Sequence, residues 1–311
     1  QYRWALKDWG RVPSAYCLPK RKKDFTTGRP IVAYTQGLFR PILEILSVVL
    51  LNIVRVAAPD AFAQGDVHTL LSDLRKFFHQ VSEECVIYNQ DLAGFFTSIE
   101  KDRFMRAWDF IWERYHRQRP DHASTFSVDA KQPIQHRRIW RGKTNVAKDS
   151  HRKIFIKDIP ALIRAVLRIN HFRVGMRVFK QIRGSPMGSP ASPALCAMVV
   201  AVNEQVWSDS YRHILQPSNL FFRTRYVDNR LMILPERLLE LQCMQEILCP
   251  DFYQTPILLE DEPGYQFLGF DVKLEERRIV FCLPTDTDEF LHVNSASTTA
   301  TLLSSFSALF S

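Results

Sequence analysis

Residues 222–234 read FRTRYVDNRLMIL, and this stretch decides the fold of the chain. Its centre, Tyr226–Asn229, interrupts a run of apolar and β-branched residues that then resumes. Because Asp and Asn favour tight turns, the pattern predicts two strands joined by a hairpin. Taken alone, such a pattern is more typical of a surface hairpin than of a functional site. Two stretches far upstream change this interpretation.

The first upstream stretch is residues 85–99, CVIYNQDLAGFFTSI. A β-type run ends at Asp91, and a turn of small residues, two phenylalanines and the start of a helix follow. Ligand chemistry often takes place where the strands of a sheet end, so Asp91 is a candidate functional residue. By itself, an Asp in this place could equally cap the helix.

The second stretch is residues 181–196, QIRGSPMGSPASPALC. A loop rich in Gly, Pro and Ser leads into a helix predicted over residues 192–215. Small residues before a helix N-terminus let a ligand approach the backbone, and such an end of a helix favours anions. Glycine-rich loops are common, so this signal is weak without the other two.

Length and composition place the chain among globular proteins. With 311 residues, 46% of them hydrophobic and 24% charged, it can bury a large core as one large domain or two. None of its six cysteines forms a C-x-x-C pair, which argues against a zinc site and favours a reducing intracellular compartment. The most apolar stretch, residues 41–58, contains Glu44 and Arg55, so we expect a buried helix and no membrane partner.

Positive charge is concentrated in one segment. The chain carries a net charge of +8, and residues 114–153 hold eleven Lys/Arg against three Asp, a surplus as large as that of the whole chain. This segment could be a solvated basic loop, but we expect a groove for a nucleic-acid backbone. The candidate nucleic-acid-binding residues are Arg137, Arg138, Arg141 and Lys143.

In their order along the chain, these stretches resemble the motifs of a reverse transcriptase. Five matches cover roughly residues 15–285. They are Lys20 with Arg29-Pro30-Ile31 for the fingers motifs, Asp91 with Phe96 for D-x-x-x-x-[FY], the loop Gly184–Pro193, Tyr226–Asn229 for Y-x-D-D, and Phe267-Leu268-Gly269 for the primer-grip hairpin. The variant Q-I-x-G-x-P-M-G-S-P followed by R-Y-V-D is most similar to Penelope-like retroelement enzymes, in which Met commonly precedes that Gly.

The resemblance implies an α+β fold, in which the fingers and palm of a right-hand polymerase carry a central antiparallel, ferredoxin-like palm sheet packed on helices. It assigns residues 1–85 to fingers and connecting helices. Residues 86–285 would form the palm, with a basic insertion at about 114–180. Residues 286–311 would be a linker or the start of a truncated thumb.

The implied activity is RNA-directed DNA synthesis, the transfer of a dNTP onto a DNA primer along an RNA template. This chemistry uses two Mg²⁺ or Mn²⁺ ions about 4 Å apart, held by hard oxygen ligands. The resemblance assigns catalysis to Asp91, Asp228 and Asn229, and metal binding to Asp91, Asp228 and the Leu92 carbonyl. It assigns nucleotide binding to Lys20, Arg29, Phe96, Met187 and Gly188, and the primer grip to Phe267, Leu268 and Gly269. A retroelement enzyme of this kind is expected in the nucleus.

Two departures from the family pattern leave alternatives open. Asn229 replaces the second Asp of Y-x-D-D, which removes a negative charge and should weaken metal binding. The Lys that many relatives carry before the primer grip is not visible, and Glu260 lies near its place. The chain could therefore be an inactive, RNA-binding scaffold. It could also be a viral RNA-directed RNA polymerase, although Phe96, a bulky ring that would exclude a ribose 2′-hydroxyl, argues against that.

Overall fold

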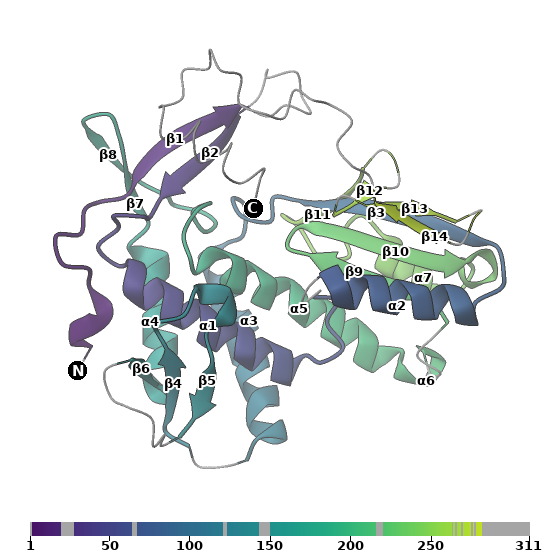
Figure 1. The fold of residues 1–311 in the computed structure, drawn as a ribbon, viewed down its shortest axis with the longest axis horizontal. Coiled ribbons are helices and arrows are strands. Elements are labelled where there is room, and N and C mark those ends of the chain that lie inside the picture. The colour runs from purple at the N-terminus through teal and green to yellow at the C-terminus, as the bar shows by residue number, and fades with distance from the viewer. Residues whose placement is uncertain are drawn as a thin grey trace, which may run out of the picture.

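The computed structural model describes residues 2–19, 28–63, 67–120, 123–142, 150–215, 220–262, 264, 266–268, 270–274, 276 and 278–281. Long helices occupy the middle of the molecule, and β-sheets lie at both ends of its long axis (Figure 1). The α-helices within the described residues are α1 (Arg40–Ala57), α2 (Val67–Gln80), α3 (Lys101–Gln118), α4 (Ile159–Arg168), α5 (Ser192–Ser210), α6 (Arg212–Leu215) and α7 (Gln242–Leu248).

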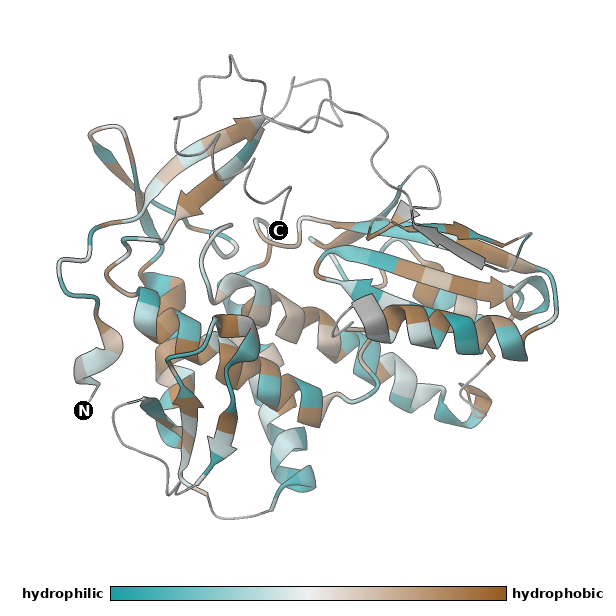
Figure 2. Cartoon of the chain, viewed as in Figure 1, coloured by the Kyte–Doolittle hydropathy of each residue, from teal (hydrophilic) through white to brown (hydrophobic). Residues whose placement is uncertain are grey.

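Helices α1, α3 and α5 pack against one another and form the centre of the core. Proline lies in the first turn of α1 and of α5, where its missing N–H costs no helical hydrogen bond. Helix α5 has no charged residue before Glu204 and is buried on nearly all sides. Figure 2 shows hydrophobic residues along α1, whereas the last turns of α3 are hydrophilic. The predicted helix over 192–215 is divided at Tyr211 into α5 and α6.

The central sheet has the strand order β11-β3-β10-β9, and all of its pairs are antiparallel. Alternate residues of β10 face opposite sides. Met232 and Leu234 join the main core over α5, and Leu231 and Ile233 join a second core with α2. The sheet is therefore covered on both faces along this part of β10. Its strands are β3 (Cys85–Ala93), β9 (Phe222–Tyr226), β10 (Asn229–Pro235) and β11 (Leu258–Asp261).

Three further sheets surround this unit. A four-stranded sheet has the order β2-β1-β7-β8, so β7 and β8, from the predicted basic insertion, pair with the N-terminal hairpin. A three-stranded sheet β5-β4-β6 lies beside the helices. Another three-stranded sheet, β12-β13-β14, packs near α2. Their strands are β1 (Ser14–Pro19), β2 (Gly28–Ala33), β4 (Thr125–Asp129), β5 (Ile139–Arg141), β6 (His151–Phe155), β7 (His171–Val174), β8 (Arg177–Lys180), β12 (Gln266–Phe267), β13 (Phe270–Lys273) and β14 (Arg278–Phe281).

The predicted fold class is confirmed: the chain is α+β, with antiparallel sheets packed on helices. The predicted domain boundaries stay predictions, and residues 286–311, the expected linker or thumb, lie outside the described residues. Within the described part of the chain, no helix has the length and apolar character needed to span a membrane.

The stability of the whole unit should depend on the contact between α1 and its neighbours. Leu50 of α1 is fully buried there, so Leu50→Ala should lower the free energy of unfolding by about 3 kcal/mol. Leu18 of β1 is 48% exposed, and Leu18→Ala should cost less than about 1 kcal/mol. Urea denaturation of both variants measures the difference, and equal losses would contradict this description of the core.

Candidate active site

Four residues lie side by side across one end of the central sheet. Asn229 of β10 pairs with Asp91 of β3 on one side and with Tyr226 of β9 on the other. Glu260 of β11 pairs with Asp91 from the opposite side. Residues paired in this way point to the same face with Cβ atoms about 5 Å apart. The structure therefore brings Asp91 and Asn229 together, as predicted, and adds Glu260 as a second carboxylate beside Asp91.

The second predicted acid, Asp228, lies in the turn between β9 and β10. Its carbonyl accepts a hydrogen bond of 2.8 Å from the backbone N–H of Leu92, which ties the turn to the residue after Asp91. The preceding residue, Val227, has a φ of 57°. A β-branched residue in this left-handed region is strained, and strain of this kind is concentrated at functional sites. Something else must hold the turn in place.

That support comes from a buried ion pair beneath the turn. Arg225 donates from Nε and Nη2 to the two carboxylate oxygens of Glu204 on α5, at 2.6 and 3.2 Å. Its Nη1 donates to the carbonyl of Val227 at 2.8 Å. Both side chains are almost fully buried. Burial alone would lower the pKa of Arg225, but Glu204 reverses this effect and leaves that pKa raised.

Glu204 has further hydrogen bonds that satisfy its buried oxygens. The hydroxyl of Tyr253 donates to Oε1 at 2.8 Å, and the backbone N–H of Phe62 donates to Oε2 at 2.9 Å. The sequence analysis missed both Glu204 and Arg225. A signal was present for Glu204, because no charged residue precedes it in helix α5; Arg225 had no such signal, because it shares a strand face with Arg223.

A second buried guanidinium lies beside the first. Arg230 follows Asn229 on β10, is fully buried, and donates from Nε and Nη2 to Oε1 of Gln90, the residue before Asp91. It also lies over the rings of Phe252 and Tyr253. Burial lowers the pKa of Arg230. The interior beneath the hairpin thus holds two guanidinium groups and the carboxylate of Glu204.

The loop of the second motif is fixed to the loop that follows Asp91. Gly184 donates its N–H to the Ile99 carbonyl, and Ser185 donates to the Phe96 carbonyl, both at 2.8 Å. Gly184 has a φ of +67°, and a Cβ there would meet the Phe96 carbonyl oxygen at 2.3 Å. Only glycine can make this approach, so the loop and the half-buried Phe96 are held as one unit.

Strand β2, from the predicted fingers, reaches the same loop. Val32 donates its N–H to the carbonyl of Met187 at 2.7 Å, and a Cβ on Gly188 would meet the Val32 carbonyl oxygen at 2.4 Å. Arg29, exposed on β2, is thus carried on the strand that contacts Met187 and Gly188. Lys20 lies outside the described residues.

The predicted primer grip lies on the face of the sheet covered by α2. Phe267 is buried in the second core with Phe222 and Leu231, and Leu268 packs at its edge. Leu268 has a φ of 53° in the turn between β12 and β13. Gly269 lies outside the described residues. The grip assignment stays a prediction.

The donor set at the hairpin fits hard divalent cations. Mg²⁺ is usually held by one or two carboxylates together with substrate phosphates and water, and Asp91 and Asp228 supply two carboxylates. Within the described residues, no three acidic, His or Cys side chains converge on one point. Below the turn, Cys196 of α5 is fully buried, and burial together with the charge of Asp228 raises the pKa of its thiol.

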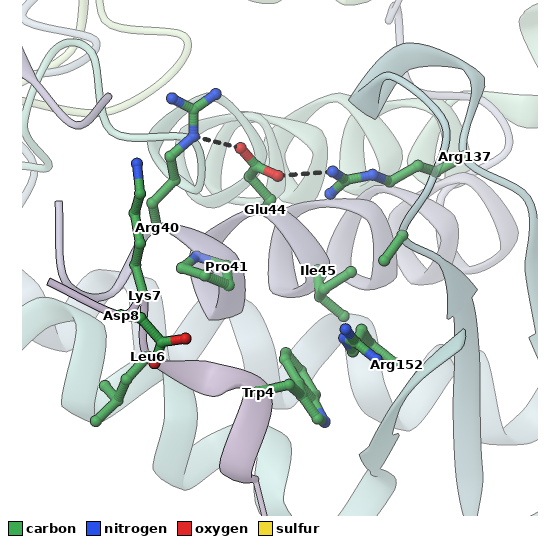
Figure 3. Close-up of a pocket in the computed structure, with 11 residues that line it drawn as sticks. Trp4, Leu6, Lys7, Asp8, Arg40, Pro41, Glu44, Ile45, Arg137 and Arg152 are labelled. Carbon is green, nitrogen blue, oxygen red and sulfur yellow. Dashed lines mark hydrogen bonds and ion pairs between the residues drawn. The ribbon is translucent and has the colours of Figure 1, made fainter. Parts of the chain in front are cut away.

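The basic segment is only partly available to a ligand. Arg137 is nine-tenths buried and pairs with Glu44 at 2.7 Å, opposite Arg40 (Figure 3). This pair lines a cavity of about 490 Å³ that none of the predicted metal-binding residues lines. Burial raises the pKa of Glu44, but the two guanidinium groups outweigh it, and the net pKa is lowered.

Two other members of the predicted basic set are placed differently. Arg141 donates to the Arg119 carbonyl at 3.2 Å and lies over the ring of Tyr115. Arg138 is exposed, and Lys143 lies outside the described residues. Arg137 and Arg141 therefore have internal contacts, and among the described members of the set Arg138 has the exposed side chain. Nucleic-acid binding by this segment stays a prediction.

Solved polymerase structures have a similar fold. Telomerase from Candida albicans, in complex with a TWJ fragment of telomeric RNA, matches 100% of this chain with a TM-score of 0.60 at 12% identity. Apo telomerase from Candida tropicalis matches 98% with a TM-score of 0.62, also at 12% identity. The chain spans about half the length of these proteins, 52% of each. The RNA-dependent RNA polymerase of BmCPV at its elongation state gives a TM-score of 0.50 at 12% identity, over 87% of this chain and 21% of that chain.

The chain has a polymerase-like fold. A scan of protein-family models gives no match, and a search of curated proteins gives none either. At 12% identity the structural likeness concerns the fold alone, and the telomerase and viral structures belong to two different polymerase groups. The structural likeness therefore supports a polymerase-like fold and does not select the Penelope-like subgroup.

The buried ion pair gives a stability prediction. Glu204→Gln leaves the guanidinium of Arg225 buried without a charge partner and should lower the free energy of unfolding by about 3 kcal/mol. Replacing both residues, as Arg225→Met with Glu204→Leu, should cost less than the sum of the single changes. Chemical denaturation measures Glu204→Gln, the single variants Arg225→Met and Glu204→Leu, and the double variant. The matched control is Glu113→Gln, which breaks an exposed pair with Arg117 and should cost well under about 1 kcal/mol. Strict additivity of the two buried changes would contradict the coupling.

Proposed function

We propose that the chain is an RNA-directed DNA polymerase of a retroelement, most like the Penelope-like enzymes. One observation carries this proposal: the strand register that sets Asn229 opposite Asp91 while the adjoining turn presents Asp228. The backbone contacts among the Gly184 loop, the Phe96 loop and β2 support it, since they link Phe96, Met187 and Gly188 to the strand that carries Arg29.

The proposed reaction joins the primer 3′-oxygen to the α-phosphorus of a dNTP. The bond from that phosphorus to pyrophosphate breaks, pyrophosphate leaves with the electron pair, and the hydroxyl proton passes to solvent. Two Mg²⁺ or Mn²⁺ ions, when bound, would supply activation of the hydroxyl and charge neutralisation. Asp91 and Asp228 would hold them, together with the carbonyl of Leu92.

Other residues of the chain would position the substrate. Arg29 offers a guanidinium fork for phosphate oxygens from the strand that contacts Gly188. Phe96 presents a half-buried ring held by Phe95 at a centroid distance of 4.8 Å, which suits it to exclude a ribose 2′-hydroxyl. The ion pair of Arg225 and Glu204 holds the turn that carries Asp228.

The charges beside Asp91 favour a second candidate, an RNA-binding scaffold without catalysis. Asn229 removes a negative charge, and the next residue, Arg230, adds a buried positive charge beside Asp91's strand neighbour Gln90. The lost negative charge and the buried positive charge both disfavour the binding of two divalent cations at the hairpin. The scaffold would bind RNA with a steep salt dependence and would incorporate no nucleotide with any metal.

Primer extension tests the proposed function. The purified chain, an RNA template, a DNA primer, dNTPs and Mg²⁺ or Mn²⁺ should give incorporation, and Asp91→Ala and Asp228→Ala should reduce it to background because each removes a metal carboxylate. Asp73→Ala, which removes an exposed acid on α2, is the matched control and should leave the rate unchanged. Incorporation that survives both active-site changes would sink the proposal, and RNA binding without any incorporation would favour the scaffold.

Sugar selectivity tests the position of Phe96. Phe96→Val should enlarge the space beneath the sugar and lower the preference for dNTPs over rNTPs by at least about tenfold in kcat/KM. Phe96→Tyr keeps the ring and should keep the preference. If the wild-type protein itself prefers ribonucleotides, the alternative of an RNA-directed RNA polymerase gains instead.

A further inference from the structure

A second cavity, of about 620 Å³, lies beside the loop that leads away from Asp91. Four segments line it: the loop at Thr97 and Ser98, the first turns of α3, Arg183 just before the second-motif loop, and residues 254–256 just before β11. Three of these segments belong to, or directly adjoin, the parts of the chain that form the candidate active site. The predicted site residues do not include any residue that lines this cavity.

The lining is strongly cationic. Arg103, Arg106 and Arg183 supply three guanidinium groups, whereas Glu100 is the one carboxylate among the lining residues. Hydroxyls of Thr97 and Ser98 add further donors. Guanidinium forks and hydroxyl groups are the donors that bind phosphate oxygens, through strong charge-assisted hydrogen bonds. The N-terminus of the 18-residue helix α3 lies at the same cavity and adds a favourable field for anions.

Arg103 and Arg106 lie close enough to repel each other, and Arg183 lines the same cavity. Arg103 donates to the carbonyls of Tyr253 and Gln254 and to the amide oxygen of Asn203, so it is fixed in place without neutralisation by a carboxylate bond. Burial, followed by repulsion from Arg106, lowers the pKa of Arg103, and the smaller opposing effect of the Asp251 carboxylate does not reverse this shift. Across the described residues, no salt bridge is formed by Arg103, Arg106 or Arg183. An anion in the cavity would relieve this repulsion.

The cavity lies on a defined side of Asp91. Strand β11 pairs with β3 so that Leu258 is opposite Ala93, and a Cβ on Gly94 would meet the Pro256 carbonyl oxygen at 2.7 Å. Gly94 lies three residues along the chain from Asp91, about 10 Å at the rise of a strand. The cavity edge at Pro256 therefore lies close to the metal-binding end of β3, on the β11 side.

The opposite side of Asp91 is the side of β10, β9 and the β12-β13 hairpin. Under the proposed function, the primer lies toward that hairpin. An in-line displacement expels its leaving group on the side away from the attacking oxygen. The leaving group of this reaction is a pyrophosphate, and the side away from the hairpin is the side of β11 and the cationic cavity.

We propose that this cavity is a pyrophosphate-binding site that receives the leaving group on its way out of the active site. The role of the site in pyrophosphate release rests on the proposed function, whereas the binding of pyrophosphate itself rests on the three guanidinium groups. Arg106 and Arg183 are the contacts to the ligand, because both are exposed, while Arg103 is held by backbone carbonyls. These cations would neutralise the negative charge of the departing pyrophosphate. They would matter more here because this chain has no lysine near Glu260, where many relatives carry one.

Isothermal titration with inorganic pyrophosphate, in the absence of nucleic acid, tests the site. The wild-type chain should bind pyrophosphate, and the double variant Arg106→Gln/Arg183→Gln should bind it at least about tenfold more weakly, because two charge-assisted contacts are lost. Arg168→Gln, which removes an exposed arginine of α4, is the matched control and should bind as the wild type does. Asp91→Asn should also retain binding, which separates the cavity from the metal site.

Two outcomes would overturn the proposal: no pyrophosphate binding by the wild type, or equal binding by the wild type and the double variant. A parallel titration with a single-stranded oligonucleotide distinguishes the source of the phosphate. If the double variant loses oligonucleotide affinity and keeps pyrophosphate affinity, the cavity holds a nucleic-acid backbone and the proposal fails. If pyrophosphate binding depends on Arg106 and Arg183 but no primer is extended, the site stands and the proposed function fails.

Discussion

The buried ion pair between Arg225 and Glu204 is the interaction on which the candidate site depends. Desolvating two charges costs several kcal/mol, which is offset only when geometry and hydrogen bonding are good. Here the guanidinium is bidentate, and the carboxylate also accepts from Tyr253 and Phe62. The remaining guanidinium nitrogen holds the Val227 carbonyl, so the strained turn bearing Asp228 is fixed from below by helix α5.

Strand pairing and loop contacts bring the other candidate residues to the turn that carries Asp228. The pairing of β10 with β3 brings Asn229 opposite Asp91, and β11 brings Glu260 to the other side. Backbone contacts then join the Gly184 loop to Phe96 and to β2, so segments from residues 28–33 to 258–261 meet at one end of one sheet. The strands are rigid, and the glycines let the loops approach closely enough to form backbone hydrogen bonds. Both features keep substrate-positioning groups in a fixed geometry.

The sequence predicted the parts of this site that carry local signals. The Asp at the end of β3, the glycine loop and the hairpin around Asp228 each have a recognisable pattern, and the structure places them together. The ion pair beneath these parts could not be predicted from the sequence, because Arg225 and Glu204 lie in different segments and meet only in the folded chain. The same limit explains Arg137, whose charge suggested a ligand surface although the fold turns it inward to Glu44. The cationic cavity likewise needs Arg103, Arg106 and Arg183 to converge from separate segments.

The central claim is that the hairpin forms a metal site weakened by Asn229. A titration of Mn²⁺ into the purified chain, followed by electron paramagnetic resonance, tests it without knowledge of the template or primer. Asn229→Asp restores a carboxylate opposite Asp91 and should tighten Mn²⁺ binding by at least about tenfold, whereas Asp228→Asn should weaken it relative to the wild type. Equal Mn²⁺ affinity in all three proteins would contradict the account.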